Sequence, residues 1–349
     1  MDFQSIVVEC FGRGWFFQVK IVKFDDSDFK DLWQQLFLES ELQPPLYQPC
    51  NTKFYDAFWP ESMFVDCSFV IEEKKIPIIG LRMTYDEQTN GLRRLSCFGL
   101  PILYIENHNL PCSQVRGAKK ALKVEWSNIL QTYQADLVNY QDVADGGSLS
   151  FFGRHLLQDG ALMEVYLTQI IDLSIADTEL YGEIRKSYKS LINWGKRNLM
   201  LSVLDGETVT TEDIERFRLL HFHAAGIETR SRETWDLQYE MILHREAFTV
   251  LGKIDDELVT AALFPYSQKC CYYGVSASNR DLFDKPLSHA IMWKAIQYAK
   301  ELGCRFFELG PQYYPKQNPE ITQKELSIST FKHGFGGRTY VRLNIVWIR

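Results

Sequence analysis

The fold is decided by the stretch CCYYGVSASNRDLFDKPLSHAIMWKAIQYAKELGCRFFELG, which occupies residues 270–310. Residues 270–276 have the composition of a short strand, and a polar loop with Arg280 and Lys285 follows them. A helix and a second strand, which ends at Gly310, come next. This order brings a helix N-terminus beside the C-terminal ends of neighbouring strands, where α/β proteins bind anionic ligands. We therefore expect the rest of the chain to build and shape a ligand site here.

Length and composition describe a folded protein of two domains. The chain has 349 residues, of which 46% are hydrophobic and 24% charged. It is too long for one ordinary core and has none of the composition of a disordered chain. Aromatic residues make up 14% of it, which predicts grooves or pockets as well as a core. The formal net charge of −7 gives no general attraction to nucleic acid or to an anionic membrane.

Nothing in the sequence indicates secretion or a membrane span. The start, MDFQSIVVEC, has no basic segment that leads into an apolar one, and no apolar run approaches the ~20 residues needed to cross a bilayer. Eight cysteines are scattered without a C-x-x-C pair. Adjacent Cys270 and Cys271 would point to opposite faces of a strand, which disfavours a disulfide between them. We predict a cytoplasmic protein with reduced structural thiols.

Apolar periodicity predicts mixed α/β structure in the first half of the chain. The turn FGLP at residues 98–101 is expected to be rigid, and a polar, Gly-containing loop at residues 142–150 is placed at the substrate site. Strands are expected at residues 16–24, 63–71, 76–84, 92–97 and 135–140, and helices at residues 28–38 and 114–133.

The second half opens with an expected strand at residues 162–173 and a long helix at residues 177–199, for which Ser174 and Asp177 are good N-cap residues. The helix after the polar loop would begin at Pro286 and stop at Gly303, both favoured residue types at those positions. The other expected strands are 201–204, 248–254, 258–265, 270–276 and 339–347, and the other expected helices are 210–225 and 235–245.

The two halves share one order of elements. Each runs as a strand, a helical region, a three-strand meander, a helix and a strand. We therefore predict two copies of one α/β unit, at residues 1–160 and 161–349.

The C-terminal order resembles the Gcn5-related N-acetyltransferase (GNAT) fold. Six segments over about residues 160–340 resemble, in family order, the FemAB-like branch of tandem-GNAT transferases, which includes the peptidoglycan interpeptide-bridge enzymes and the BioF2-like acetyltransferase domain. The resemblance implies an α/β protein of two tandem GNAT-like (acyl-CoA N-acyltransferase) domains with mixed, mostly antiparallel sheets. The segments are IRKSYKSLI (184–192), ETRS (228–231) ahead of Trp235, NRDL (279–282), PLSH (286–289), FELG (307–310) and FKHGFGG (331–337).

The family resemblance implies transfer of an acyl or aminoacyl group to an amine. Ordinary GNAT enzymes hold the donor pyrophosphate with a Gly-rich turn, and residues 280–288 stand at that place without a glycine. Bridge-forming relatives place a Phe-Lys pair near the ester of aminoacyl-tRNA, and Phe331-Lys332 stands at that motif. Acyl-CoA is the expected donor; aminoacyl-tRNA is the alternative, against which stand the acidic balance and the lack of a basic appendage. The donor-binding candidates are Arg280, Lys285, Ser288, His289 and Phe331, and no metal is expected.

Lys332 and Glu308 are the candidate catalytic residues. Lys332 would supply positive charge to the developing oxyanion or to a phosphate, and its alternative is a surface lysine on a turn. Glu308 would accept the proton of the amine, and its alternative is a salt bridge to a neighbouring cation. His289 sits at a helix N-terminus, where a helix-dipole effect on its pKa and plain packing compete with a proton shuttle.

An anionic acceptor such as a nucleotide sugar would need cationic side chains. Lys186 lies with Lys189, Asn193 and Arg197 on a stripe for which the spacing alone favours a solvated helix face, and Tyr188 is equally a core residue. The candidate substrate-binding residues are Arg185, Lys186, Tyr188, Arg230, Arg232, Trp235 and Tyr273.

Two other interpretations are rejected. His221 and His223 are two residues apart on a helix and point away from each other, so they cannot easily share a metal. The glycines at 334, 336 and 337 lack the G-x-x-x-x-G-K-[ST] pattern, which leaves a turn of close backbone approach.

Three hypotheses follow. The first is an N-acyltransferase that modifies the amine of an amino sugar or a related precursor of a cell-surface glycan. The second is an aminoacyl-tRNA-dependent transferase of the FemABX type that acts on a peptidoglycan precursor. The third is a non-catalytic binding module, motivated by the loop without glycine at residues 280–288. The sequence leaves the acyl group, the acceptor and the oligomeric state open.

Overall fold

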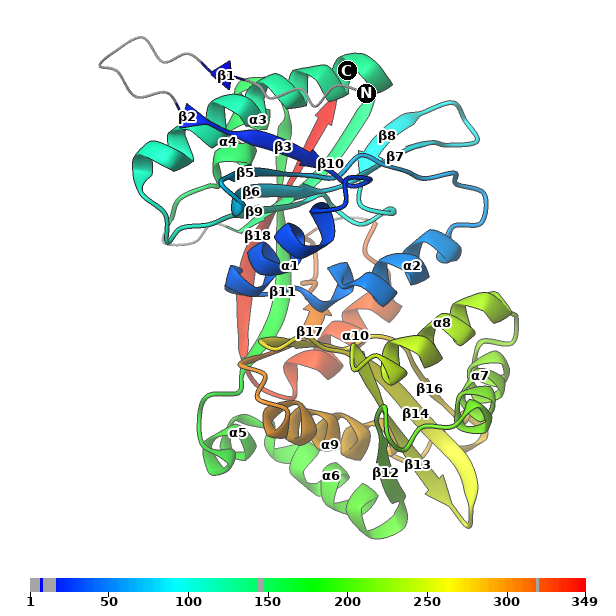
Figure 1. Cartoon of the computed structure of the whole chain (residues 1–349). Coiled ribbons are helices and arrows are strands. Elements are labelled where there is room, and N and C mark those ends of the chain that lie inside the picture. The colour runs from blue at the N-terminus through cyan, green and yellow to red at the C-terminus, as the bar shows by residue number, and fades with distance from the viewer. Residues whose placement is uncertain (1–6, 9–16, 144–146, 318–319) are drawn as a thin grey trace. The chain divides into compact units, whose positions relative to one another are not determined.

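The computed structural model describes residues 7–8, 17–143, 147–317 and 320–349 (Figure 1). The chain is a mixed α/β protein whose sheets are mostly antiparallel, which confirms the predicted fold class. The beginning of the strand expected at 16–24, most of the MDFQSIVVEC start and the middle of the loop expected at 142–150 lie outside the described residues.

The chain divides into two compact units, and neither is continuous in sequence. Unit 1 comprises Met1–Gln43, Trp59–Val165 and Arg342–Arg349, and unit 2 comprises Pro44–Phe58 and Tyr166–Val341. The boundary expected at 160/161 thus lies close to the crossing at Val165 and Tyr166. Two segments lie outside the expected division: Pro44–Phe58 precedes the boundary but belongs to unit 2, and Arg342–Arg349 follows it but belongs to unit 1.

Unit 1 contains two sheets around a core that includes Trp126, Tyr140 and Phe152. One sheet has the order β3-β5-β6-β9, and the other has β10, β8, β7 and β4, beside the final residues of β18. A short ladder of β1 (Val7–Val8) and β2 (Phe17–Gln18) precedes them. The elements are β3 (Lys20–Lys23), α1 (Phe29–Glu39), β4 (Val65–Asp66), β5 (Phe69–Glu73), β6 (Ile76–Arg82), β7 (Thr84–Glu87), β8 (Arg93–Ser96), β9 (Leu103–Glu106), α3 (Cys112–Tyr133), β10 (Leu137–Val143) and α4 (Phe151–Gln158).

Unit 2 contains the sheet β12-β13-β14-β16 and the strands β15-β17-β11. Its first elements are η1 (Pro45–Tyr47), α2 (Pro49–Phe58), β11 (Leu162–Asp172, of which Tyr166 onward belongs here), α5 (Asp177–Glu183), α6 (Lys186–Asn198), β12 (Met200–Leu204), α7 (Thr211–Ala225), α8 (Arg232–Leu243) and β13 (Ala247–Ile254). The others are β14 (Glu257–Pro265), β15 (Cys270–Tyr272), β16 (Ser276–Ser278), η2 (Arg280–Leu282), α9 (Leu287–Glu301), β17 (Phe306–Pro311), α10 (Gln323–His333) and β18 (Arg338–Ile348).

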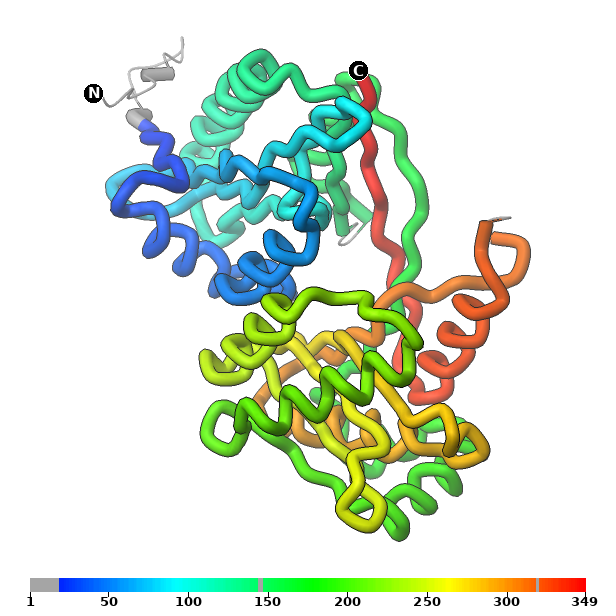
Figure 2. The backbone as a smooth tube through the Cα atoms, turned by 90° about the vertical axis from the view of Figure 1, so that its right-hand side faces the viewer, coloured from blue at the N-terminus to red at the C-terminus, as the bar shows by residue number. Residues whose placement is uncertain are grey.

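Helices cover both faces of the four-stranded sheet in unit 2 (Figures 1 and 2). Alternation along the strands decides the faces, because successive side chains point to opposite sides. Val250 and Ala262 pack with residues of α6 and α9, whereas Leu251 and Ala261 pack with residues of α2, α7 and α8. The sheet is therefore buried on both sides.

The order of elements is the same in the two units, in agreement with the predicted tandem fold class. The sheets β3-β5-β6-β9 and β12-β13-β14-β16 are both fully antiparallel and have the same strand order. The first is followed by α3, β10, α4 and β11, and the second by α9, β17, α10 and β18. Unit 1 adds the hairpin of β7 and β8 between the third and fourth strands.

The helix expected at residues 177–199 is two helices, so that prediction is wrong in the middle. Ile184 and Arg185 have extended ψ angles of 134° and 133° between α5 and α6. The backbone N–H of Arg185 donates to the carbonyl of Gly334 at 2.9 Å instead of continuing the helix. Ser174 does not cap the helix either, because the N-cap position is Ala176.

The strand expected at residues 270–276 is also two strands. β15 pairs in parallel with β17, whereas β16 pairs antiparallel with β14. The exchange takes place at Tyr273, which donates its N–H to the carbonyl of Glu308, and at Gly274, which donates to Leu263. The neighbouring strands β15 and β17 thus stop pairing just after Tyr272 and Glu308.

Smaller differences concern helix ends and short helices. Pro286 is the N-cap residue of α9 rather than its first helical residue, while Gly303 follows the helix with a φ of +87°, as expected. Sequence patterns missed α2, α4 and the position of α10. The first two are short, with ten and eight residues, and they depend on their surroundings. For α2 this means the buried carboxylate of Glu246, which accepts the N–H groups of Cys50 and Asn51 at the helix start.

Candidate functional site

The ends of β15 and β17 hold the candidate catalytic residues of unit 2. β17 places Glu308 opposite Tyr272 of β15 on one side and opposite Ile170 of β11 on the other. The chain then passes through Pro311 to α10, whose last turn carries Lys332. Residues that lie 24 positions apart in sequence thereby meet at one end of the strand.

Glu308 is a buried carboxylate with a neutral partner. It is 5% exposed, and the hydroxyl of Thr168 on β11 donates to its Oε1 at 2.8 Å. A carboxylate is a group that can accept a proton from a substrate amine.

Lys332 is buried as well, which rules out the alternative of a surface lysine on a turn. It is 8% exposed, and its Nζ donates to the carbonyl of Pro311 at 3.3 Å. Burial lowers the pKa of Lys332 from 10.5 to about 8, and the charge of Glu308 opposes that shift only in part. Buried ionisable groups with shifted pKa values cluster at functional sites, which makes this pair a candidate site.

Four aromatic side chains pack on one another next to this pair, and we call them the aromatic cluster: Tyr188, His289, Phe331 and Phe335. The ring of Tyr188 lies 4.5 Å from that of His289 and 5.3 Å from that of Phe335, and the ring of His289 lies 5.3 Å from that of Phe331. Gly334 permits this packing, since a Cβ there would lie 2.1 Å from Cε2 of Tyr188. The close approach predicted for the glycine-containing turn therefore has a specific partner.

His289 is a neutral member of the aromatic cluster. Burial lowers its pKa from 6.5 to about 4, and its Nδ1 is buried with no hydrogen-bond partner among the described residues. Burial is the largest cause of the shift, which fits the packing interpretation of this histidine. Arg185 lies over the outer face of Tyr188, 5.1 Å from the ring centre.

The loop at residues 280–288 is an ordered turn without glycine. The side chain of Asn279 accepts from the N–H of Asp281 and starts the short helix η2. Ser288 is tied to Ser278 through a hydroxyl–hydroxyl contact of 3.2 Å, and Lys285 pairs with Asp284. Arg280 is exposed. The residues expected to bind the acyl donor are thus present at the start of α9. Two of them, Lys285 and Ser288, already have partners near the loop, in Asp284 and Ser278.

The expected acceptor residues lie in different surroundings. The guanidinium of Arg230 lies over the rings of Phe54 and Phe58 of α2, at 5.7 and 5.6 Å, and burial lowers its pKa. Trp235 is a core residue that packs against Phe217 and His221. Arg232 is exposed and pairs with Glu215 and Asp236. Tyr273 contacts the hydroxyl of Ser276 at 2.7 Å, and Lys186 is exposed on α6.

Sequence patterns missed Thr168, Tyr272, Phe54 and Phe58. Thr168 and Tyr272 come from strands that are neighbours only in the folded sheet, so no local spacing could have joined them to Glu308. Phe54 and Phe58 are four residues apart, which is a helical signal, but α2 lies far along the chain from Arg230.

Other site types find little support in the described part of the chain. No group of three His, Cys, Asp or Glu residues there is arranged to hold a metal ion. His221 packs on Trp235, and His223 lies beside Phe222. None of the helices described is both long and apolar enough for a membrane span.

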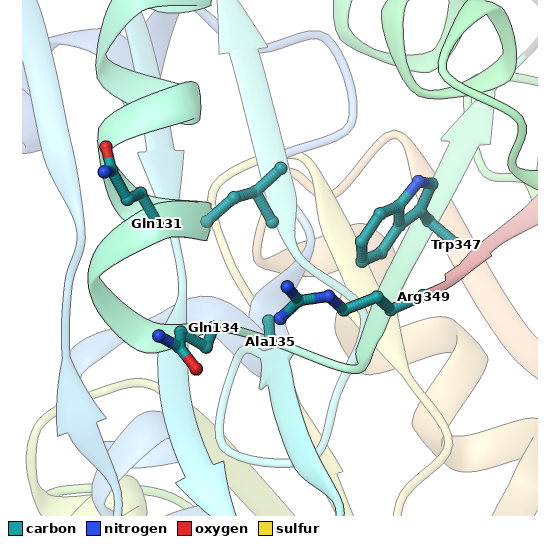
Figure 3. A pocket seen from close by; sticks show the side chains of 6 residues that line it. Gln131, Gln134, Ala135, Trp347 and Arg349 are labelled. Atoms are coloured by element: carbon teal, nitrogen blue, oxygen red, sulfur yellow. The ribbon is translucent and has the colours of Figure 1, made fainter.

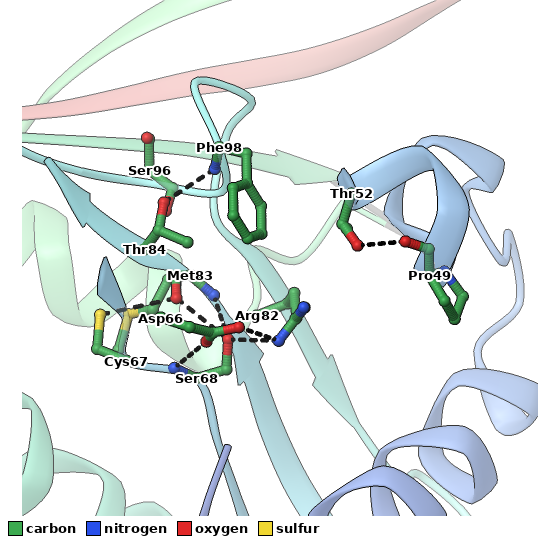
Figure 4. Close-up of polar contacts among 10 residues, drawn as sticks. All are labelled: Pro49, Thr52, Asp66, Cys67, Ser68, Arg82, Met83, Thr84, Ser96 and Phe98. Atoms are coloured by element: carbon green, nitrogen blue, oxygen red, sulfur yellow. Dashed lines mark hydrogen bonds and ion pairs between the residues drawn. The ribbon is translucent and has the colours of Figure 1, made fainter. Parts of the chain in front are cut away.

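Unit 1 has a shallow cavity and a polar cluster of its own. The cavity, of about 290 Å³, is lined by Leu130, Gln131, Gln134, Ala135, Trp347 and Arg349, none of which was predicted as a site residue (Figure 3). In the polar cluster, Arg82 donates to Asp66 at 2.6 Å and to Ser68 at 3.2 Å (Figure 4). The turn at Phe98 and Gly99 has two left-handed residues, and Thr84 accepts the N–H of Phe98.

Comparison with known proteins shows the fold. No protein-family model matches the sequence, and no curated protein matches it significantly. FemX shares the fold with a TM-score of 0.67 and 12% identity, over 93% of this chain and 96% of FemX. A tandem GNAT protein from the clavulanic acid biosynthesis pathway has a TM-score of 0.54 and 13% identity, over 95% of this chain and 98% of that one.

A third structure, L-PGS from Bacillus licheniformis, has a TM-score of 0.55 and 13% identity, over 90% of each chain. All three cover nearly the whole of this chain. The protein therefore has a tandem GNAT fold similar to that of FemX, as the sequence segments predict.

Proposed function

We propose that this protein is an N-acyltransferase that transfers an acyl group to the amine of an amino sugar or a related precursor of a cell-surface glycan. The observation that carries the proposal is the buried pair of Lys332 and Glu308 at the end of β17. It lies in a fold shared with FemX and with a tandem GNAT protein. The same pair in an unrelated fold would carry far less weight.

The chemistry of the pair fits amide formation. The neutral amine attacks the acyl carbonyl, the oxygen gains negative charge, and the amine loses a proton. Glu308 accepts that proton directly or through a water molecule, and protonated Lys332 stabilises the charge on the oxygen. Since the pKa of Lys332 is about 8, most of the lysine is protonated at neutral pH.

Acyl-CoA is the proposed donor substrate, bound at the start of α9. Arg280, Lys285, Ser288, His289 and Phe331 are the proposed contacts on that side. Helix α9 has fifteen residues, and its N-terminus favours anionic groups. The proposed contacts for the acceptor are Arg185, Lys186, Tyr188, Arg230, Arg232, Trp235 and Tyr273.

Aminoacyl-tRNA is the second candidate donor. Two observations favour it. The loop at residues 280–288 has no glycine. The TM-score with FemX is also higher than that with the tandem GNAT protein, at 0.67 against 0.54. In that case Phe331 and Lys332 would lie near the ester of the donor, and the acceptor would be a peptidoglycan precursor.

A transfer assay distinguishes these candidates. The purified protein is supplied with acetyl-CoA and UDP-glucosamine, and separately with charged tRNA and a peptidoglycan precursor, and acyl transfer is measured by mass spectrometry. Transfer from acetyl-CoA that resists ribonuclease supports the first donor, and ribonuclease-sensitive transfer supports the second. No transfer with either donor, together with no measurable binding of acetyl-CoA, would support the non-catalytic alternative.

Two substitutions test the residue roles. Lys332→Ala and Glu308→Gln are each expected to lower kcat by about 100-fold, the usual cost of removing one catalytic group. Lys324→Ala is the matched control, because Lys324 is exposed on the same helix α10. Full activity of both variants, with folding intact, would remove the proposed roles.

A further inference from the structure

Gly310 leaves one side of its backbone open beside Lys332. It is the last residue but one of β17 and has a φ of +86°, a conformation that glycine adopts far more easily than other residues. A Cβ built on Gly310 would lie 3.2 Å from Nζ of Lys332 and 3.1 Å from the hydroxyl oxygen of Tyr272. The ammonium group of Lys332 on α10 and the hydroxyl group of Tyr272 on β15 therefore both lie close to the Cα of Gly310.

Tyr272 reaches this point from the neighbouring strand. It is the last residue of β15 and pairs in register with Glu308. Directly after it the chain leaves β17, since Tyr273 makes the final backbone bond to Glu308 and Gly274 bonds to Leu263. The pairing of β15 with β17 therefore ends at Glu308, before Leu309 and Gly310. The Tyr272 hydroxyl lies beside Gly310, just past the end of this pairing.

Lys332 arrives from the opposite direction in sequence, on the last turn of α10. Its Nζ donates to the carbonyl of Pro311, the residue after Gly310, at a rather long 3.3 Å. An ammonium group has three protons to donate. Nζ lies close to Gly310, as the Tyr272 hydroxyl does. Protons of the ammonium group other than the one donated to Pro311 can therefore be donated to a ligand there.

We propose that the Tyr272 hydroxyl and the Lys332 ammonium group together bind the carbonyl oxygen of the acyl donor above Gly310, and that the missing side chain at Gly310 keeps this two-donor site open. This inference rests on the proposed acyl transfer, and it adds Tyr272 as a catalytic residue and Gly310 as a positioning residue.

The transfer step is balanced as follows. The amine nitrogen forms a bond to the carbonyl carbon, and the carbonyl π electrons move to the oxygen, where Tyr272 and Lys332 donate. The carbonyl re-forms as the bond from carbon to the leaving sulfur or oxygen breaks. Glu308 receives the proton of the amine and returns it to the leaving thiolate or alkoxide. Two donors aimed at the oxygen act where charge appears during reaction, which is where they lower the barrier most.

Tyr272→Phe tests the first donor. It removes only the hydroxyl, and we expect kcat for acetyl transfer to UDP-glucosamine to fall by about 100-fold while KM changes less than about threefold. In bound acetyl-CoA labelled with ¹³C at the carbonyl, the hydrogen-bond shift of the carbonyl signal is expected to be smaller in the variant. Unchanged kcat and an unchanged carbonyl signal would overturn the role of Tyr272.

Gly310→Ala tests the open position, and Gly303→Ala is its matched control. Both glycines have nearly the same φ, +86° and +87°, but a Cβ at Gly303 meets nothing within 4 Å. Backbone strain is therefore common to both variants, and the tight contact with Lys332 and Tyr272 belongs to Gly310→Ala alone. We expect Gly310→Ala to lower kcat by at least about tenfold more than Gly303→Ala.

A measurement without turnover separates this inference from the proposed function. The pKa of Lys332, followed by NMR of its side chain, is expected to change in Gly310→Ala, because a methyl group 3.2 Å from Nζ forces the ammonium group to shift within its buried place. It should not change in Gly303→Ala. If the wild-type protein transfers no acyl group, the proposed function fails, and with it the two-donor role. Equal Lys332 pKa values in the two glycine variants would by themselves overturn the positioning role of Gly310.

Discussion

The two units build the same sheet and helix order but treat their buried carboxylates differently. In unit 1, Asp142 near the end of β10 is 3% exposed and accepts hydrogen bonds from the N–H and hydroxyl of Ser150, the N–H of Val143 and the hydroxyl of Tyr140. In unit 2, Glu308 in the corresponding strand β17 is 5% exposed, accepts from Thr168, and has the ammonium group of Lys332 as its nearby cation.

The two carboxylates differ in their partners, since Asp142 is surrounded by neutral hydrogen-bond donors and Glu308 has a buried lysine nearby. The Asp142 carboxylate is surrounded by four donors, all from residues at most eight positions away. One of these residues, Ser150, also caps helix α4. Such a saturated site stabilises the local fold. Burial disfavours the charged form in both places, since it raises the pKa of Asp142 and lowers that of Lys332. In unit 2, however, the buried group is a lysine beside a buried carboxylate, and such groups cluster at functional sites. The proposed chemistry therefore belongs to unit 2, and we expect unit 1 to act as a scaffold at this position.

The largest effect is expected for Lys332→Met, which should separate activity from stability. Transfer should fall by about 100-fold or more, because the positive charge near the acyl oxygen is lost. Stability at pH 7 should rise, by up to about 3 kcal/mol, because a pKa lowered from 10.5 to about 8 means that folding works against the charged lysine. Thermal unfolding and transfer assays on the same preparation measure both.

The pH dependence supplies the control for this variant. Between pH 8 and 10.5 the unfolded wild-type chain binds more protons at Lys332 than the folded one, so wild-type stability should rise with pH across that window. The gain of Lys332→Met over wild type should shrink over the same window. Wild-type transfer should decline as pH passes about 8. A variant that is less stable than wild type at pH 7 would contradict the view of Lys332 as a strained functional group.

Gly334→Ala should be next in size and would disturb unit 2 alone. A methyl group there would lie 2.1 Å from the Tyr188 ring, in a cluster of rings with no spare space. Overpacking of this kind costs about 1–3 kcal/mol. Gly182→Ala is the matched control, because a Cβ at this helical glycine meets nothing within 4 Å, and it should be neutral or slightly stabilising. Chemical denaturation of both variants measures the difference; equal stabilities would show that the aromatic cluster can relax.

Parts of this comparison could be predicted from the sequence, and others could not. The alternating strands and the stop of α9 before Gly303 depend on local patterns, and the structure confirms them. The break at Ile184 and Arg185 depends on the carbonyl of Gly334, about 150 residues away, and no local pattern contains it. Motif segments placed Glu308 and Lys332 on the list of site residues. The meeting of Lys332 with Tyr272 and Gly310 required the partner exchange of β15 and β16.

Asp142→Asn should weaken unit 1 and leave the chemistry intact. Oδ2 of Asp142 accepts two donors from Ser150, and Oδ1 accepts two more, so an amide NH₂ in either orientation would face donors. The expected loss of stability is about 1–3 kcal/mol. Asp159→Asn, whose side chain is 46% exposed, is the control in the same unit. Transfer per folded molecule should be unchanged, and a large loss of kcat in Asp142→Asn would contradict the assignment of unit 1 as scaffold.

His289→Phe should have the smallest effect and tests whether the aromatic cluster is packing or chemistry. The histidine is neutral at physiological pH because burial lowers its pKa to about 4, and its Nδ1 has no partner among the described residues. Between pH 4 and 6.5 the unfolded wild-type chain binds more protons at this residue, so wild-type stability should fall as pH drops through that window. The variant lacks this loss and should gain on wild type at pH 5 but hardly at pH 7.5, as thermal unfolding at the two pH values would show. The kcat for transfer should stay within about threefold of wild type, since a ring replaces a ring of similar shape. Loss of the proposed donor contact of His289 should affect the KM for acetyl-CoA instead. A 100-fold loss of kcat with stability unchanged would instead make His289 a proton carrier, and the chemistry of unit 2 would then extend from the end of β17 to the start of α9.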